Sequence, residues 1–304
     1  MTQRNLGILL AVQLLLVAIT WWPSDPAASR RPLFDLDRDA VERIEIVGGP
    51  ADGESAVLVK DGEIWRVHSA ADYPATPAKI EALLDTLLGL EAGPAIATQS
   101  QSHAPLNVAD DSYGRRIVVS AEGEVYDWVV GAATSRSVNV RRVGEDEVYQ
   151  AQGASEWSFR NDSASYFETT YLDANPASFG AVVVQNGNGD LRFEQSEGVW
   201  TLADLEADES ADSDAISAFL LAVAHLRMTE PVGLQTLPEH GLEDGPRIDW
   251  TIIAEDQSIT GGYTLGSEIE GDRFLKAVGD SFVVRARESD LEKLLEARRS
   301  QFLE

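Results

Sequence analysis

The 304-residue chain has no cysteine and few basic side chains. The lack of cysteine excludes disulfides, thiol catalysis, cysteine-ligated zinc and iron–sulfur sites, and the acylated cysteine of a lipoprotein anchor. Only 24 Lys and Arg face 51 Asp and Glu, so the formal net charge is −27. This charge repels phosphate backbones and anionic lipid headgroups, and nucleic-acid binding is therefore not expected.

Recognisable catalytic and metal-binding motifs are also lacking. No two of the four histidines have the i, i+4 spacing of a helical metal pair, and no Gly-x-Ser-x-Gly or Ser-x-x-Lys nucleophile motif occurs. The acidic stretch 204–214 lacks the Gly and Glu positions of a calcium loop. We therefore expect no catalytic residue, no metal and no cofactor, and a protein that is not an enzyme.

The chain has one long apolar run, at its start. Leu6 to Trp22 carry no charge, and as a helix they would span about 26 Å, the short edge of what crosses a bilayer. Arg4 on the near side favours a cytoplasmic N-terminus. We expect residues 1–30 to form a transmembrane helix and a linker, with the rest outside the cytoplasm. The alternative is a cleaved signal peptide, with small residues at 26–29, which would also export the chain.

The remaining chain repeats a pattern of strands and a helix. Trp65 and Trp200 each follow a Gly turn, and Ile80 and Ile216 begin similar helical stretches at nearly the same separation along the chain. A fixed order of elements at one steady offset predicts a tandem duplication, with copies at 31–175 and 176–304. We expect an α+β fold, in which each copy is a mostly antiparallel sheet with one long amphipathic helix on a face.

The two helices and the two Trp strands also predict the core. The apolar residues at helical spacing, and a Trp in an alternating strand, are typical of buried positions. The predicted structural core consists of Trp65, Ile80, Leu84, Leu87, Trp200, Ile216, Leu220 and Val223.

Two histidines are the only weak functional candidates. His103 and His240 lie in loops at matching places of the two copies, because their separation along the chain is close to that of the two Trp residues. A shared site is one interpretation, and a pair of inherited structural loop residues is the other. Gly131 and Gly266, which end the stretches "YDWVVG" and "GGYTLG", also correspond at this offset.

Several stretches together resemble a bacterial family. The opening "LFDLDRDAVERIEI" at 33–46 is followed by "DGEIWRV", "YPATPAKIEALLDTLLGL", "VNVRRVGEDEVYQA" and "YLDANPASFGAVVV". This order is similar to that of domain of unknown function 4340, and the resemblance covers nearly the whole chain. The resemblance implies a membrane-anchored protein often encoded near ABC-transporter components of the gliding-motility or auxiliary type. It supplies no catalytic residues.

The expected function is therefore that of a non-catalytic accessory or scaffold module of an ABC-type transport or cell-envelope system. The expected location is the bacterial inner membrane, with a single pass and the bulk of the chain in the periplasm. Transporter subunits are the expected partners. One alternative is a ligand-binding protein with a site between the two repeats, and another is a hydrolase that uses carboxylates.

Overall fold

The computed structural model describes residues 30–304, with the exception of 255–256. Its largest feature is a ten-stranded sheet, and the pairings whose register is described are antiparallel. The strands are, in order across the sheet, β1 (Arg31–Pro32), β6 (Glu91–Ala92), β12 (Val148–Gln152), β11 (Ser137–Arg142), β10 (Glu124–Thr134), β9 (Arg115–Ala121), β2 (Val41–Gly48), β3 (Ser55–Asp61), β4 (Ile64–Val67) and β5 (Tyr73–Pro74).

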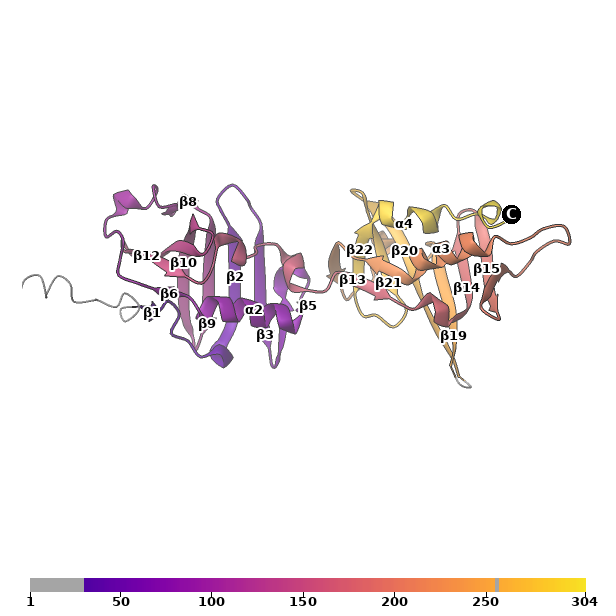
Figure 1. The fold of residues 1–304 in the computed structure, drawn as a ribbon, viewed down its shortest axis with the longest axis horizontal. Coiled ribbons are helices and arrows are strands. Elements are labelled where there is room, and N and C mark those ends of the chain that lie inside the picture. Colours follow the sequence, from indigo (N-terminus) through magenta and orange to yellow (C-terminus); the bar gives the residue numbers. More distant parts are fainter. Residues whose placement is uncertain (1–29, 255–256) are drawn as a thin grey trace, which may run out of the picture. The chain divides into compact units, whose positions relative to one another are not determined.

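A second large sheet has eight strands (Figure 1). They are, in order, β16 (Val199–Leu202), β15 (Gly189–Ser196), β14 (Phe179–Asn186), β19 (Arg247–Ala254), β20 (Gln257–Ile269), β21 (Asp272–Ala277), β22 (Val283–Arg287) and β18 (Glu230–Gly233). Two small ribbons pair β7 (Val108–Ala109) with β8 (Ser112–Tyr113) and β13 (Thr170–Asp173) with β17 (His225–Arg227).

The described helices are short. The α-helices are α2 (Pro77–Leu88), α3 (Ser213–Ala224) and α4 (Glu288–Leu295). Figure 1 shows α3 and α4 beside the eight-stranded sheet, where they contact one another and the strands β16, β14 and β22. The 3-10 helices are η1 (Arg38–Ala40), η2 (His68–Ala70), η3 (Ser100–Ser102), η4 (Glu156–Ser158), η5 (Ser163–Tyr166), η6 (Pro176–Ser178), η7 (Pro238–His240) and η8 (Arg299–Gln301).

The prediction of one long amphipathic helix per copy is wrong. Helices α2 and α3 have 12 residues each, and the fold is dominated by antiparallel strands. The predicted helices ran on to Leu90 and Leu226, which do have helical spacing. Helix α2 ends before Gly89, a poor helix former. After α3, the backbone at His225 becomes extended because β17 pairs with β13, so sheet pairing overrides the periodicity.

The predicted transmembrane helix at Leu6–Trp22 lies outside the described residues. Within residues 30–254 and 257–304, no helix has the length and apolar character needed to cross a bilayer.

Seven strands follow the same order in both large sheets. The order β4-β3-β2-β9-β10-β11-β12 in the first sheet has its counterpart in β16-β15-β14-β19-β20-β21-β22 in the second. The predicted hairpin turns are confirmed as well, because β3 pairs with β4 around Gly62 and β15 pairs with β16 around Gly198. Both glycines have positive φ angles, 63° and 82°, which L-residues rarely adopt.

Contacts along the backbone divide the chain into two compact units. One contains the described residues up to Glu42 with Ile46–Gly53 and Ala82–Phe159, and the other contains Arg43–Glu45, Glu54–Glu81 and Arg160–Glu304. The division between repeats at residue 175 remains a prediction.

The predicted core residues are mostly buried. Exposure is 5% or less for Ile80, Leu84, Leu87, Trp200, Ile216, Leu220 and Val223. Trp65 differs, because it is only partly buried. Its strand β4 is followed in the sheet only by the two-residue strand β5, whereas Trp200 contributes to a core rich in aromatic rings. In that core Phe193, Phe219 and Phe302 lie with ring centroids 4.9–5.6 Å apart.

Candidate functional site

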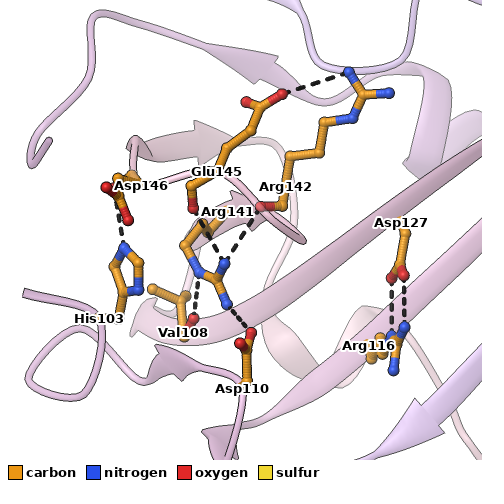
Figure 2. A network of polar contacts seen from close by, with 9 residues as sticks. All are labelled: His103, Val108, Asp110, Arg116, Asp127, Arg141, Arg142, Glu145 and Asp146. Carbon is orange, nitrogen blue, oxygen red and sulfur yellow. Dashed lines mark hydrogen bonds and ion pairs between the residues drawn. The ribbon is translucent and has the colours of Figure 1, made fainter. Parts of the chain in front are cut away.

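The most developed polar network is centred on Arg141, in β11 (Figure 2). Its side chain is 3% exposed. The guanidinium donates from Nε to the carbonyl of Val108 at 2.7 Å and from Nη1 to the carbonyls of Glu145 and Arg142 at 3.1 and 3.4 Å. Nη2 donates to the carboxylate of Asp110. A buried guanidinium needs partners for its five N–H groups, and here three backbone carbonyls and one carboxylate supply them.

The alternation of β11 places this side chain on one face of the sheet. Ser137, Asn139 and Arg141 are all buried on that face, and Asn139 donates to the carbonyl of Leu106 at 3.1 Å. Two polar side chains of one strand therefore hold the loop that contains Leu106 and Val108. Beneath this loop, Val108, Val129 and Val148 form a small apolar cluster. The arrangement fastens a loop and leaves the Arg141 donors engaged.

His103 belongs to the same layer. It is 8% exposed, and its Nε2 lies 3.0 Å from the carbonyl oxygen of Asp146, so Nε2 carries the proton and donates (Figure 2). Asp146 lies in the connection between β11 and β12, which Arg141 holds through Glu145. His103 and Arg141 together therefore bind two loops to each other.

His240 is held within the second unit by similar means. It is 4% exposed, its Nδ1 accepts a hydrogen bond from the backbone N–H of Leu237 at 3.2 Å, and its ring packs on Phe274 at 4.5 Å between centroids. Each candidate histidine thus directs one ring nitrogen to the backbone of its own unit. The structure describes no substrate-facing role for either.

The other two histidines pair with carboxylates at the surface. His68 lies 2.7 Å from Asp72, and His225 lies 2.7 Å from Asp173, its cross-strand partner. Both histidine side chains are about half exposed, at 58% and 49%. No Ser or Thr hydroxyl among the described residues hydrogen bonds to either ring, so neither pair has the third member of a hydrolytic triad.

No group of three or more His, Asp or Glu side chains within the described part of the chain is arranged to hold a metal ion. The acidic stretch 204–214 instead provides the helix cap Asp212, which accepts from the backbone N–H of Ala215 at 2.9 Å. Its Glu209 is bound by Arg299, and this hydrogen bond lowers the pKa of Glu209.

The opposite face of β11 contributes to a cavity of about 360 Å³. Directly opposed residues of antiparallel strands share a face, and the pairs Trp128–Arg142 and Val140–Tyr149 place Trp128, Arg142 and Tyr149 side by side. The next strands add Ala92 and Arg31, whose Cα atoms are also paired. Five adjacent strands, β10, β11, β12, β6 and β1, therefore form the floor of this cavity.

The segment after β1 provides a wall of the cavity, through Leu33 and Asp35. Between them, Phe34 is buried and packs edge to face on Trp128, with centroids 6.1 Å apart. Trp128 is itself 8% exposed, and its indole N–H has no acceptor among the residues that the structure describes. An indole N–H normally finds a partner when it is buried, so this donor is unusual.

Two cations line the cavity. The guanidinium of Arg31 lies 5.4 Å from the ring centroid of Tyr149 and donates to its hydroxyl at 3.2 Å. Arg142 lies 3.6 Å from Glu145, with both side chains 45% exposed. Burial, followed by the negative charge of Glu147, raises the pKa of Tyr149, so the phenol is neutral at physiological pH.

Sequence reasoning identified His103 and His240 but missed Arg141 and the cavity. A signal for Arg141 was present, because an arginine at an inward position of the apolar stretch "SVNVR" needs internal partners. The cavity gave no such signal, since its floor comes from strands between Arg31 and Tyr149 that are brought together only by sheet pairing.

The comparisons with known proteins identify a family and no described function. No curated protein and no solved structure matches the chain. One family model, described as Domain of unknown function (DUF4340), matches residues 65–245, which is more than half of the chain. The protein therefore belongs to the DUF4340 family.

Proposed function

We propose that this protein is a non-catalytic module of the bacterial cell envelope that serves an ABC-type transporter or an envelope assembly. The observation that carries the proposal is the use made of the candidate polar groups. Arg141 and His103 spend their donors mainly on backbone carbonyls, and His240 accepts from a backbone amide. Such contacts stabilise loops and present a folded surface, which is what an accessory module requires.

The proposed location is the outer face of the inner membrane. It is supported by the uncharged run Leu6–Trp22 with Arg4 before it, which favours a cytoplasmic N-terminus and export of the rest. The proposed partners, transporter subunits, rest on the family resemblance. The surplus of acidic side chains supports a role among proteins and disfavours binding to anionic lipids or nucleic acids.

We also propose that the two large sheets arose by tandem duplication. The seven strands in the same order support this, as do the recurrences of the Trp strand and the helix at nearly the same offset along the chain. Two copies of one structural module offer two related surfaces for partner proteins without any catalytic requirement.

A peroxidase fused after Glu304 tests location and partnership together. In intact cells it should biotinylate periplasmic proteins, and the enriched inner-membrane proteins should include subunits of a transporter or an envelope assembly. A cytoplasmic fusion of the same peroxidase serves as the control. Labelling of cytoplasmic proteins would overturn the location. Periplasmic labelling without enrichment of any such subunit would overturn the accessory role.

A further inference from the structure

The cavity floored by β10, β11, β12, β6 and β1 has a charge pattern that selects one class of ligand. We propose that it binds a glycerophosphoethanolamine group, the headgroup of a zwitterionic phospholipid. The assignment of a lipid as the source rests on the proposed membrane location, whereas binding of the headgroup itself does not. The argument has three steps, which concern the cations, the carboxylates and the reach of the chain.

Arg31 is the first indication of an anionic group. In a chain with 51 acidic and 24 basic residues, Arg31 forms no ion pair with any carboxylate that the structure describes, and it lies over Tyr149 instead. The pair of Arg142 with Glu145, at 3.6 Å and 45% exposed, is of the solvent-exposed kind that contributes little, so Arg142 can exchange its partner. Two guanidinium groups at one cavity suit a phosphate.

The carboxylates exclude a ligand that is only anionic. Asp35 and Glu145 line the same cavity, so its formal charges cancel, and a purely negative ligand would meet two carboxylates as well as the two arginines. A ligand with a phosphate and an ammonium group matches both signs. The flanking rings of Trp128 and Tyr149 add faces that attract an ammonium group. Trp128 also has the indole N–H that lacks an acceptor among the described residues.

The position of the cavity in the chain indicates a membrane lipid. Only residues 23–30 separate the apolar run, which ends at Trp22, from Arg31 in the cavity floor. A stretch of this length spans at most about 30 Å, so the cavity stays near the headgroup layer if the run is in the bilayer. Tethering of this kind raises the effective concentration of headgroups at the site. A zwitterionic headgroup has no net charge and is not repelled by the net charge of −27.

The test is calorimetric titration of the full chain in a nonionic detergent. The probes are glycerophosphoethanolamine, glycerophosphoglycerol, inorganic phosphate and dihexanoyl phosphatidylethanolamine. Glycerophosphoethanolamine should bind, and R31Q and R142Q should each weaken it by about tenfold, the loss of one charge-assisted hydrogen bond. The double variant D35N/E145Q should weaken glycerophosphoethanolamine and leave inorganic phosphate no weaker. R192Q, at an exposed arginine of β15, is the matched control and should change nothing.

Several results would overturn the proposal. They are no binding of glycerophosphoethanolamine at millimolar concentration, binding that the variants at Arg31 and Arg142 do not change, or equal weakening by R192Q. Dihexanoyl phosphatidylethanolamine binding more tightly than glycerophosphoethanolamine supports a lipid source, and equal affinity overturns that source. Thermal melts show whether each variant is folded, and these side chains are exposed enough for that to be expected. Because the titration is made in detergent, it can succeed even where the peroxidase experiment contradicts the proposed location.

Discussion

Two neighbouring arginines in β11 show how the pleat of a strand assigns different work to identical side chains. Arg141 is directed to the face covered by the loop at Val108 and is buried with four partners. Arg142 is directed to the opposite face, where it is 45% exposed and has one carboxylate at 3.6 Å. A one-residue change of register would exchange these environments, so the pair also fixes the register of β11.

Replacing Arg141 by Lys should therefore be costly. A lysine amine cannot reach the span of carbonyls that the guanidinium bridges, and buried carbonyls would lose their donors. We expect a loss of about 2–4 kcal/mol in the free energy of unfolding. Denaturant unfolding followed by circular dichroism measures this. The control is R142K, which should lie within about 0.5 kcal/mol of the unmodified protein. Similar effects of the two substitutions would show that the Arg141 network contributes no stability.

At the scale of elements, the two longest strands share an unusual feature. A Cβ added at Gly131 in β10 would lie 2.3 Å from the carbonyl oxygen of Asn107, and one at Gly266 in β20 would lie 1.9 Å from the carbonyl oxygen of His240. In each case the loop that contains the candidate histidine lies directly on a strand glycine. The glycines are needed here because a backbone approaches closely, and neither has a positive φ angle.

Substitution of either glycine by Ala should displace its loop. We expect G131A and G266A each to destabilise the protein by about 1–3 kcal/mol, the usual cost of forcing extra atoms into a packed site. G187A is the control, because a Cβ at Gly187 has no described heavy atom within 4 Å and the residue has no positive φ angle. Thermal unfolding provides the measurement. A marked effect at only one of the two glycines would contradict the proposed equivalence of the loops.

The sequence predicted the local elements better than their limits. Hairpins such as β3–β4 were predictable because the alternation and the Gly turn are both local signals. The ends of the helices were not, since the pairing of β17 with β13 depends on residues from Thr170 onward, far from the predicted helix. The correspondence of His103 with His240 was predictable from spacing. That both bind backbone atoms was not, because their partners Asp146 and Leu237 carry no distinctive pattern.

At the scale of the whole molecule, charge is the dominant feature. The described ion pairs are mostly exposed at one or both partners, and such pairs contribute about 0–1 kcal/mol each. A net charge of −27 spread over the folded chain opposes compaction by repulsion between like charges. The fold must therefore derive its stability mainly from the buried apolar faces of its sheets.

Screening should consequently raise the thermal midpoint. The Debye length falls from about 30 Å at 0.01 M salt to about 3 Å at 1 M, which removes repulsion over long distances while the exposed ion pairs have little to lose. We expect the midpoint to rise with NaCl and to rise equally with CaCl2 at the same ionic strength, because the described residues offer no grouped metal ligands. Glycine betaine at equal osmolality, which does not screen charge, separates screening from solute exclusion. A midpoint that falls with NaCl would mean that the ion pairs outweigh the repulsion, and a rise at micromolar Ca²⁺ would reveal a cation site.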